Sequence, residues 1–559
     1  MRKMWFAENK SWSQFRRSLG GFSAIVCKDA STVWAEDPYG KTIAQGEAGV
    51  DDASVIQSAL DNVGDYASIL LKGNFLLNTH IQIPSKKTVV VDGILKQRDN
   101  VAGNDINIIR NSDFVNGDED ITLIFRSGYV DGNNANQPAG YSDRYAVFFK
   151  RVTNLKIYNL EIRNPYHWAC RIDYCDGVFI ENFASFSDRS YNDGLHLVDT
   201  INVEIKGVRG VVGDDLFAIT ADYRDVYNIT ATNIVGSSTT ANGIRIYQSS
   251  RSIENEEERT LKNIEITNFI IDSPYSHGVI FNPTGAKTTI ENITLRGKII
   301  SPQTQHGVIL GANAGELFIR LNIDVDIIHP AKHGIVAESN TTIKDSTIKV
   351  SVEQPGDGFN CVRLPLTNSI LEAITKYDTS GYSSPQHSVV MLKGEGNIII
   401  ADIDGGLRGI MLGTSNTAVT RTRIVANIKN CDSWAIAEEG MSDYNEIEAL
   451  LYNNGSPILI SGSNTKIYAA TRYQNSGTAT FSGNGTTTDF EIGAHGLVIT
   501  DPSKIAVKVT PVSSDAIAAS PCVGYVDPAD NTKIRVKFSS APASGSENVK
   551  IVWYAEVVS

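Results

Sequence analysis

The chain has 559 residues, with 50 Lys and Arg against 63 Asp and Glu, and a formal net charge of −13 at pH 7. The acidic balance and the absence of a Lys/Arg cluster argue against a nucleic-acid partner, and no stretch approaches the roughly 20 apolar residues that span a bilayer. The length exceeds one ordinary domain, although a β-solenoid can extend for hundreds of residues because each coil packs only on its neighbours.

Residues 1–46 are predicted to form a separate N-terminal segment. They begin with Met and several basic residues but lack the continuous apolar run of about 7–15 residues that a secretory signal peptide requires. An aromatic and basic piece is followed by a short β-like stretch that ends at Gly46. We therefore expect no secretory signal and no membrane insertion.

A short amphipathic helix is predicted over residues 53–62. Its apolar residues recur at helical spacing, at Val55, Ile56, Ala59 and Leu60. Two Asp residues just before it favour the helix N-terminus by capping and by charge. Because the first coil of a solenoid has an open end, we expect this helix to cover it.

Short strand-like runs recur through the middle of the chain with a period of roughly 23–35 residues, which is typical of a solenoid. They begin at Asn154, Gly177, Asn202, Asn228, Asn263 and Asn292. Apolar residues alternate with polar ones within each run, so one face points into the coil. The sequence therefore predicts an all-β protein, with a right-handed parallel β-helix over residues 47–474. The recurrent Asn fits an asparagine ladder and also ordinary turns with αL geometry.

A different pattern begins after about residue 475, where alternating strands are separated by Gly, Pro and Asn turns. We expect a small C-terminal β-sandwich-like domain over residues 475–559. The six cysteines are scattered and are predicted to be buried free thiols. Cys170 and Cys175 lie close in sequence, but Cys170 falls in a strand whose successive side chains point to opposite faces, which argues against a disulfide.

Alignment of successive coils on their inward apolar residues brings polar side chains together. Leu195 aligns with Phe217 and then with Ile244, and stacked strands lie about 4.8 Å apart, so aligned positions are near neighbours. Polar and ionisable groups are thereby expected to converge on one exposed face. The first column holds Trp168, Asp193, Asp215, Asn242, His277 and His306; the second holds Arg171, His196, Ala218, Arg245 and Ile280; and the third includes Tyr247, with Asp214 beside the acidic pair.

The three carboxylates Asp193, Asp214 and Asp215 are the strongest candidates for chemistry. Carboxylates this close repel one another, so the pKa of at least one is expected to rise. Glycoside hydrolysis uses such a division, in which one carboxyl protonates the leaving oxygen and an ionised one activates water or attacks the sugar. Each Asp alone also fits a turn cap that accepts backbone amides. The three together, flanked by Arg and His, favour catalysis.

Two regions resemble known protein families. Residues 49–60, the following SILLKGNFLL and residues 128–137 resemble the start of pectate-lyase-like β-helices in bacteriophage tailspikes. This resemblance implies a homotrimer in the virion tail, attached to other tail or particle proteins through residues 1–46, that acts on a host surface polysaccharide. The C-terminal region resembles modules of viral spike and fibre proteins, which implies trimerisation or receptor contact.

The acidic motifs resemble glycoside hydrolase family 28, the polygalacturonase-like hydrolases. In this resemblance Asp214 matches the general acid, and Asp193 and Asp215 match the base-side carboxylates. The flanking residues are expected to contact substrate: His196, Arg245, Tyr247, His277, Asn242, Trp168 and Arg171. The chain departs from the family pattern because Asn242 occupies the slot of a family histidine, Tyr247 replaces a lysine and His277 comes one coil late. The family's substrate is therefore not carried over.

Two alternatives remain open. A polysaccharide lyase on the same fold could use Arg245, Tyr247, His196 or His277 for β-elimination. A non-catalytic receptor-binding or structural spike is the alternative from a different class, since a fold does not define chemistry. Clustered Asp side chains can hold Ca²⁺, but nothing in their spacing demands a metal, and we predict no metal and no cofactor.

Overall fold

The computed structural model forms two compact units, Met1–Ser351 and Val352–Ser559. The described residues are 21–187, 189–249, 258–282, 288–311, 316–338, 340–452, 454–467, 474–497, 503 and 505–557. Residues 1–20 of the expected attachment segment lie outside them. The domain boundaries 1–46, 47–474 and 475–559 stay predictions.

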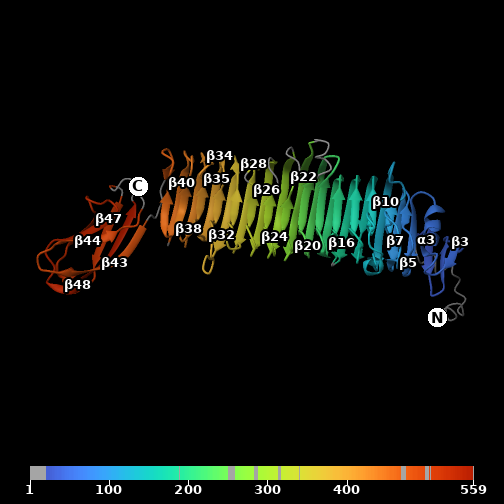
Figure 1. Ribbon diagram of the computed structural model, residues 1–559, viewed down its shortest axis with the longest axis horizontal. Coiled ribbons are helices and arrows are strands. Elements are labelled where there is room, and N and C mark those ends of the chain that lie inside the picture. The colour runs from blue at the N-terminus through green and yellow to red at the C-terminus, as the bar shows by residue number, and fades with distance from the viewer. Residues whose placement is uncertain are drawn as a thin grey trace. The chain divides into compact units, whose positions relative to one another are not determined.

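The first unit is a parallel β-solenoid, as predicted (Figure 1). Each coil contributes one strand to a sheet of short strands, called here the short-strand sheet. Its strands in this unit are β6 (Ile81–Ile83), β9 (Ile109–Asn111), β12 (Val147–Lys150), β15 (Cys170–Asp173), β17 (Leu195–Val198), β19 (Phe217–Ala221), β21 (Ile244–Gln248), β23 (Val279–Phe281), β25 (Val308–Leu310) and β27 (Ile335–Ala337).

The remaining strands of each coil form a second sheet, called here the long-strand sheet, which stacks in parallel in the same way. Its longer strands in this unit are β4 (Ala67–Lys72), β7 (Lys87–Asp92), β10 (Asp118–Ser127), β13 (Val152–Tyr158), β16 (Asp176–Phe186), β18 (Ile201–Val212), β20 (Val226–Ser238), β22 (Thr260–Asp272), β24 (Thr289–Ile300) and β26 (Leu317–Ile328). Shorter pieces are β5 (Phe75–Leu77), β8 (Leu95–Gln97), β11 (Val130–Asp131) and β14 (Glu161–Arg163).

The predicted coil register is confirmed. Leu195 pairs with Phe217, which pairs with Ile244, which in turn pairs with Val279. All four side chains are fully buried, because alternate positions of each strand point into the coil. This register places the polar positions on either side of these residues in columns across the coils.

The predicted cap helix is present as α3 (Asp52–Asp61), one residue from its expected bounds. It buries its apolar stripe, Val55, Ile56, Ala59 and Leu60, and contacts β1 (Ala24–Lys28), β2 (Thr32–Glu36) and β3 (Thr42–Glu47) as well as β4, β5 and β6. β1 pairs in parallel with β4 and antiparallel with β2. The described part of the N-terminal segment therefore joins the first coil.

An exposed asparagine ladder runs along the long-strand sheet. The side-chain amide of Asn228 donates to Asn202 Oδ1 (2.9 Å), and that of Asn263 donates to Asn228 Oδ1 (3.0 Å). Asn202, Asn228 and Asn263 also have positive φ, at 55°, 58° and 53°. The same residues thus form both a ladder and αL turns, because Asn tolerates αL geometry and its amide reaches the next coil.

The six cysteines are free. Four are buried as predicted, but Cys27 and Cys522 are only half-buried. The expectation of burial is wrong for these two because they lie in β1 and β46, strands near the start of the first sheet and in the small C-terminal module.

The second unit contains further parallel coils and two small antiparallel sheets. The coil strands include β30 (Val362–Leu364), β33 (Val389–Met391), β36 (Ile410–Leu412), β39 (Trp434–Glu438), β41 (Ser456–Leu459), β32 (Ile370–Tyr377), β35 (Ile398–Gly405), β38 (Arg423–Lys429), β40 (Glu446–Tyr452) and β42 (Lys466–Ile467). The antiparallel sheets have the orders β43 (Gln474–Gly483), β48 (Gly545–Val557), β45 (Ile505–Pro511) and β44 (Asp489–Ala494), β47 (Lys533–Phe538), β46 (Cys522–Val526). A short helix that the sequence did not predict, α5 (Ser514–Ala518), packs on this module's core.

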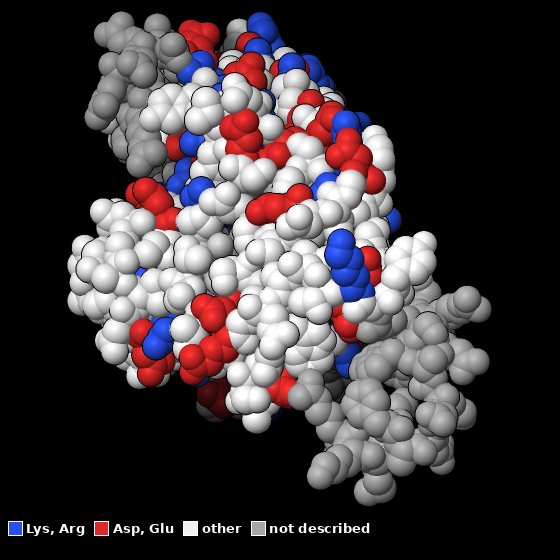
Figure 2. Space-filling model, turned by 90° about the vertical axis from the view of Figure 1, so that its right-hand side faces the viewer, with Lys and Arg blue, Asp and Glu red and all other residues white. Residues whose placement is uncertain are grey.

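Acidic and basic side chains are interspersed on the face seen in Figure 2, at the N-terminal side of the molecule. Among the described residues, no helix is long and apolar enough to cross a membrane.

Candidate active site

The solenoid brings the three predicted carboxylates together at the start of two stacked strands. Asp193 precedes β17, and Asp214 and Asp215 precede β19. The backbone N–H of Gly194 donates to the carbonyl of Asp215 (2.9 Å), which holds the two turns in register. One carboxylate oxygen from each Asp lies within 4.8 Å of the other two. These residues can therefore interact strongly as one electrostatic cluster.

The cluster is more buried than the sequence predicted. Asp193 and Asp215 are only 3% and 1% exposed, and Asp214 is half-buried. Asp193 Oδ1 accepts the backbone N–H of Asp215 (3.0 Å), and Asp215 Oδ1 accepts that of Asn242 (3.2 Å). The expected exposed face is thus wrong for these two, because each turns back to cap the next coil. Turn capping and clustering occur together.

His196 contacts the carboxyl group of Asp193. Its Nδ1 lies 2.5 Å from Asp193 Oδ2, its Nε2 lies 2.6 Å from Thr220 Oγ1, and its ring stacks on Trp168 at 4.0 Å. Burial, and then the nearby Arg171, lower the pKa of His196 to about 3. Burial, and then repulsion from Asp215, raise the pKa of Asp193 well above its ordinary value. Burial therefore favours the uncharged form of both side chains.

Asp214 is the carboxyl that remains accessible. Burial raises its pKa to about 8, and the neighbouring Asp193 and Asp215 push in the same direction. Arg245 opposes this shift but does not cancel it. Asp214 consequently holds a proton at neutral pH, which is the state that a general acid requires.

Asp215 is held by donors on the next coil. Its Oδ1 accepts a hydrogen bond from Asn242 Nδ2 (2.8 Å), and its Oδ2 lies 3.5 Å from Arg245 Nη1. Arg245 also donates through Nε to Asn282 Oδ1 (3.2 Å) and lies over the Tyr247 ring at 4.0 Å. The guanidinium is thereby oriented toward the carboxylates and compensates their charge.

Arg171 occupies the same strand position as His196, one coil earlier. It pairs with Asp173 (2.9 Å) and donates to the Tyr145 hydroxyl (2.7 Å). Its guanidinium lies 5.2 Å from the Trp168 ring centroid. Arg171 and Trp168 therefore form the N-terminal side of the cluster.

His277 belongs to an imidazole ladder. Its backbone N–H donates to Asn242 Oδ1 (3.2 Å), and its Nδ1 accepts the backbone N–H of His306 (3.4 Å). His306 Nδ1 accepts the N–H of His333 in the same way (3.1 Å), and successive rings stack at 5.3 and 5.1 Å. Burial lowers the pKa of His277 to about 4, so the ring is neutral at neutral pH. The substrate contact expected of His277 stays a prediction.

Three supporting residues were not predicted as part of the site: Thr220, Asn282 and Tyr145. Thr220 and Asn282 lie in the same aligned column as Tyr247. The alignment of the coils could therefore have predicted them as site residues. Tyr145 precedes β12, and only the folded chain brings its hydroxyl to Arg171.

Comparisons with known proteins address the same region. Residues 66–313 match the family model of glycosyl hydrolases family 28. This range contains the three Asp residues and every expected substrate contact, and it confirms the predicted resemblance over this part of the chain. The match supports the glycoside hydrolase class of reaction.

No curated protein matches the chain. Among solved structures, the tailspike protein of E. coli bacteriophage HK620 in complex with a pentasaccharide is 14% identical, with a TM-score of 0.44 and coverage of 93% of this chain and 92% of that chain. A double mutant of the same tailspike is 13% identical, with a TM-score of 0.46 and the same coverage.

Proposed function

We propose that this protein is a glycoside hydrolase that depolymerises a host surface polysaccharide, with Asp214 as the general acid. The observation that carries the proposal is the half-buried Asp214, whose pKa is raised to about 8 beside two buried carboxylates. The family-28 match over residues 66–313 supports the reaction class.

In the proposed reaction, Asp214 donates its proton to the glycosidic oxygen as the bond to the leaving sugar breaks. Asp215 accepts a proton from the water that attacks the anomeric carbon. Asp193, held by His196, positions the Asp215 backbone through the 3.0 Å hydrogen bond that its carboxyl accepts from the Asp215 N–H. Proton return from Asp215 to Asp214 through solvent completes the cycle, so one water is consumed for each bond broken.

We propose that four side chains contact the sugars on either side of the scissile bond: Arg245, Arg171, Trp168 and Tyr247. Asn242 and His277 continue this surface. The guanidinium and aromatic groups are suited to hydroxyl and ring contacts. From the resemblance of residues 49–60 and 128–137, we also propose that the chain acts as a homotrimeric tailspike in a virion, attached through residues 1–46.

A lyase is less well supported by the same site. Burial raises the pKa of Tyr247 far above its ordinary value and lowers the pKa of His196 and His277 to about 3 and 4. Tyr247 therefore keeps its proton, and the two imidazoles are weak bases for abstraction of a proton beside a carboxylate.

The deciding experiment incubates the purified protein with a panel of bacterial capsular and O-antigen polysaccharides. We expect shorter chains with new reducing ends and no ultraviolet absorbance from unsaturated sugars. Unsaturated products would replace the hydrolase with a lyase. Binding without chain shortening would favour a non-catalytic spike.

Arg245→Met is expected to move the alkaline limb of the pH–rate profile to higher pH. Activity requires protonated Asp214, so in the wild type it falls as the pH rises through about 8. Arg245 lowers the pKa of Asp214 by its positive charge, and its removal raises that pKa further. The measurement is kcat/KM across pH for Arg245→Met, with Arg245→Lys as the charge-conserving control that keeps the limb near its original position. An unchanged limb in both variants would show that another group titrates there.

Chelation with EDTA is expected to leave the rate of chain shortening unchanged. The three carboxylates have oxygens close enough to share a cation, but Arg245 lies against Asp215 and Asp214 holds a proton. The Arg245 cation and the proton on Asp214 already reduce the negative charge that would attract a metal ion. A loss of activity that Ca²⁺ restores would contradict this account.

A further inference from the structure

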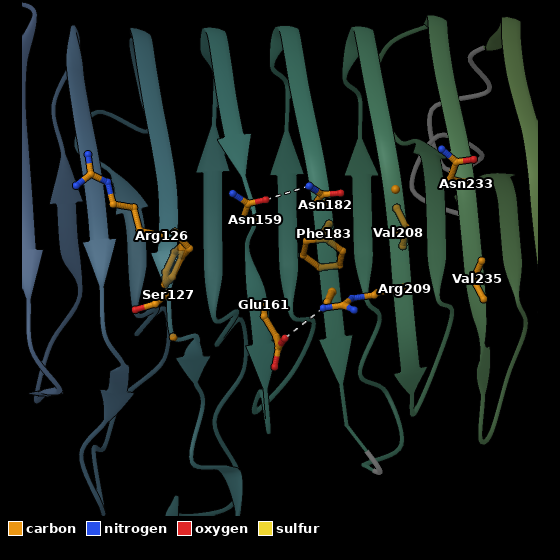
Figure 3. Close-up of a pocket in the computed structure, with 14 residues that line it drawn as sticks. Arg126, Ser127, Asn159, Glu161, Asn182, Phe183, Val208, Arg209, Asn233 and Val235 are labelled. Atoms are coloured by element: carbon orange, nitrogen blue, oxygen red, sulfur yellow. Dashed lines mark hydrogen bonds and ion pairs between the residues drawn. The ribbon is translucent and has the colours of Figure 1, made fainter.

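A second concave site lies on the long-strand sheet, whereas the carboxylates belong to the short-strand sheet. Its cavity has a volume of about 630 Å³. Figure 3 shows residues from β10, β14, β16, β18 and β20 around it, so it extends across several coils. The groove thus has room for a ligand larger than a single water.

One wall of the groove is a second ladder of αL residues. Asn159, Asn182, Gly207, Asn233 and Asn268 occupy equivalent positions on successive coils. Asn182 Nδ2 donates to Asn159 Oδ1 (3.0 Å), as drawn in Figure 3, and Asn268 Nδ2 donates to Asn233 Oδ1. The chain of amides is broken only at the third position, because Gly207 has no side chain.

The break leaves complementary groups on its two sides. Asn182 Oδ1 would accept a hydrogen bond from an amide at position 207, and Asn233 Nδ2 would donate one to it. No side-chain hydrogen bond within the described residues occupies either atom. The two coils that carry them are two steps apart, which is about 10 Å at about 4.8 Å per step.

In the first asparagine ladder a glycine also interrupts the chain of side-chain hydrogen bonds, but a neighbouring side chain replaces the missing acceptor. Gly177 stands between Asn154 and Asn202, but Asp176 beside it accepts the Asn202 amide (2.7 Å). The corresponding neighbour of Gly207 is Lys206, whose ammonium has no acceptor to offer. The open break is therefore specific to the groove.

The opposite wall carries charge and an apolar surface. Glu161 and Arg209 pair at 3.6 Å across the small Ala184, and Figure 3 shows this pair facing the groove. Val235 continues the same row and is 47% exposed. Glu161 also pairs with Arg163 (2.6 Å), so this wall offers guanidinium donors together with one carboxylate acceptor.

We propose that the groove is a second, non-catalytic saccharide-binding site centred on the break at Gly207. A sugar ring fits the space of about two coil steps. Its hydroxyls donate to Asn182 Oδ1, accept from Asn233 Nδ2 and reach Glu161 and Arg209, while a C–H face rests on Val235. Paired amide and charged groups around a concave surface are the features that orient a polar ligand. The site has no acid–base carboxylate pair, so it binds without cleaving.

Gly207→Asn tests the proposal by completing the ladder. A Cβ at position 207 would meet its nearest atom, Asn182 Oδ1, at 3.6 Å, an ordinary contact. The φ of Gly207 is +94°, in the region that Asn enters more readily than other side chains. The matched control is Gly177→Asn, where φ is +73° and the nearest atom also lies at 3.6 Å. Both substitutions are equivalent for the fold, but only one fills the groove.

The probe is an array of bacterial oligosaccharides, applied to the full chain with Asp214→Asn as background so that cleavage is slow during the binding measurement. We expect Gly207→Asn to lose at least tenfold in affinity for one group of glycans that the Gly177→Asn control retains. Chain-shortening activity, measured without the Asp214 change, is expected to stay the same in both variants. This separates the groove from the proposed catalytic site.

Equal glycan binding by Gly207→Asn and Gly177→Asn, or no glycan bound by the background protein, would overturn the proposal. A change in oligomeric mass on Gly207→Asn without a change in glycan binding would also overturn it, because the groove would then be a contact between copies of the chain. The cleavage assay of the Asp214 variant tests only the proposed hydrolase. Its result does not change what the glycan-binding comparison says about the groove.

Discussion

Asp214→Asn is expected to lower kcat by about 10²–10⁴-fold, the usual contribution of a general acid. The amide cannot donate a proton to the leaving oxygen, yet it has nearly the same shape and keeps the fold. The measurement is the rate of new reducing ends on a cleavable polysaccharide. Asp272→Asn, an exposed position on β22, is the control and should retain the wild-type rate. A folded Asp214→Asn protein with wild-type activity would assign proton donation to another residue.

The same variant is expected to be more thermostable than the wild type at neutral pH. The pKa of Asp214 rises from 3.8 to about 8 on folding, so between these values the folded chain binds more protons than the unfolded chain. Its contribution to stability is therefore present at low pH and is lost as the pH rises from about 4 to about 8. Asparagine does not titrate, so the gain in Tm should be largest near pH 8 and vanish near pH 4, as measured by thermal melts.

Asp215→Asn is expected to lose both activity and stability. Loss of the base should lower kcat by about 10²–10⁴-fold. Arg245, 29% exposed, would lose its carboxylate partner, which should reduce the free energy of unfolding by about 1–3 kcal/mol. The opposite stability effects of Asp214→Asn and Asp215→Asn distinguish the proposed acid from the carboxyl that pairs with Arg245.

The double variant Asp215→Asn, Arg245→Met is the matched control. It should recover much of the lost stability because no unpaired cation remains, but it should recover none of the activity. Wild-type activity in Asp215→Asn together with an inactive Asp193→Asn would transfer the base role to Asp193. Restored activity in the double variant would show that Asp215 acts only by holding Arg245.

The sequence was enough to predict which site residues align across the coils. Alternate apolar residues within each strand allow Leu195, Phe217 and Ile244 to be aligned. This alignment by itself places Asp193 next to Asp215 and puts His196 in the same row as Arg245. The cap helix was predictable for a similar local reason, since its apolar stripe follows helical spacing. Short-range periodicity was therefore enough to predict both the alignment of the site residues and the cap helix.

Burial could not be predicted in the same way. His196 alternates out of the coil like an exposed residue, and Asp193 and Asp215 lie in the turns just before β17 and β19. Nevertheless His196 is covered by ring stacking with Trp168, and the two Asp side chains are covered by backbone amides of neighbouring coils. These contacts join residues more than 20 positions apart and have no local signature. The ordering of the pKa values depends on them, because desolvation is the largest cause of the shifts at Asp193, Asp214 and His196.

The sequence by itself determined that the chain is a parallel β-solenoid and which residues stack across its coils, because strand alternation and a recurring turn residue define both. Only the tertiary structure decided that burial raises the pKa of Asp214 to about 8, that His277 continues into an imidazole ladder, and that Gly207 opens a groove on the long-strand sheet. The physical reason is that alignment depends on each coil's own pattern, whereas electrostatics and cavities depend on how side chains from several coils exclude water together.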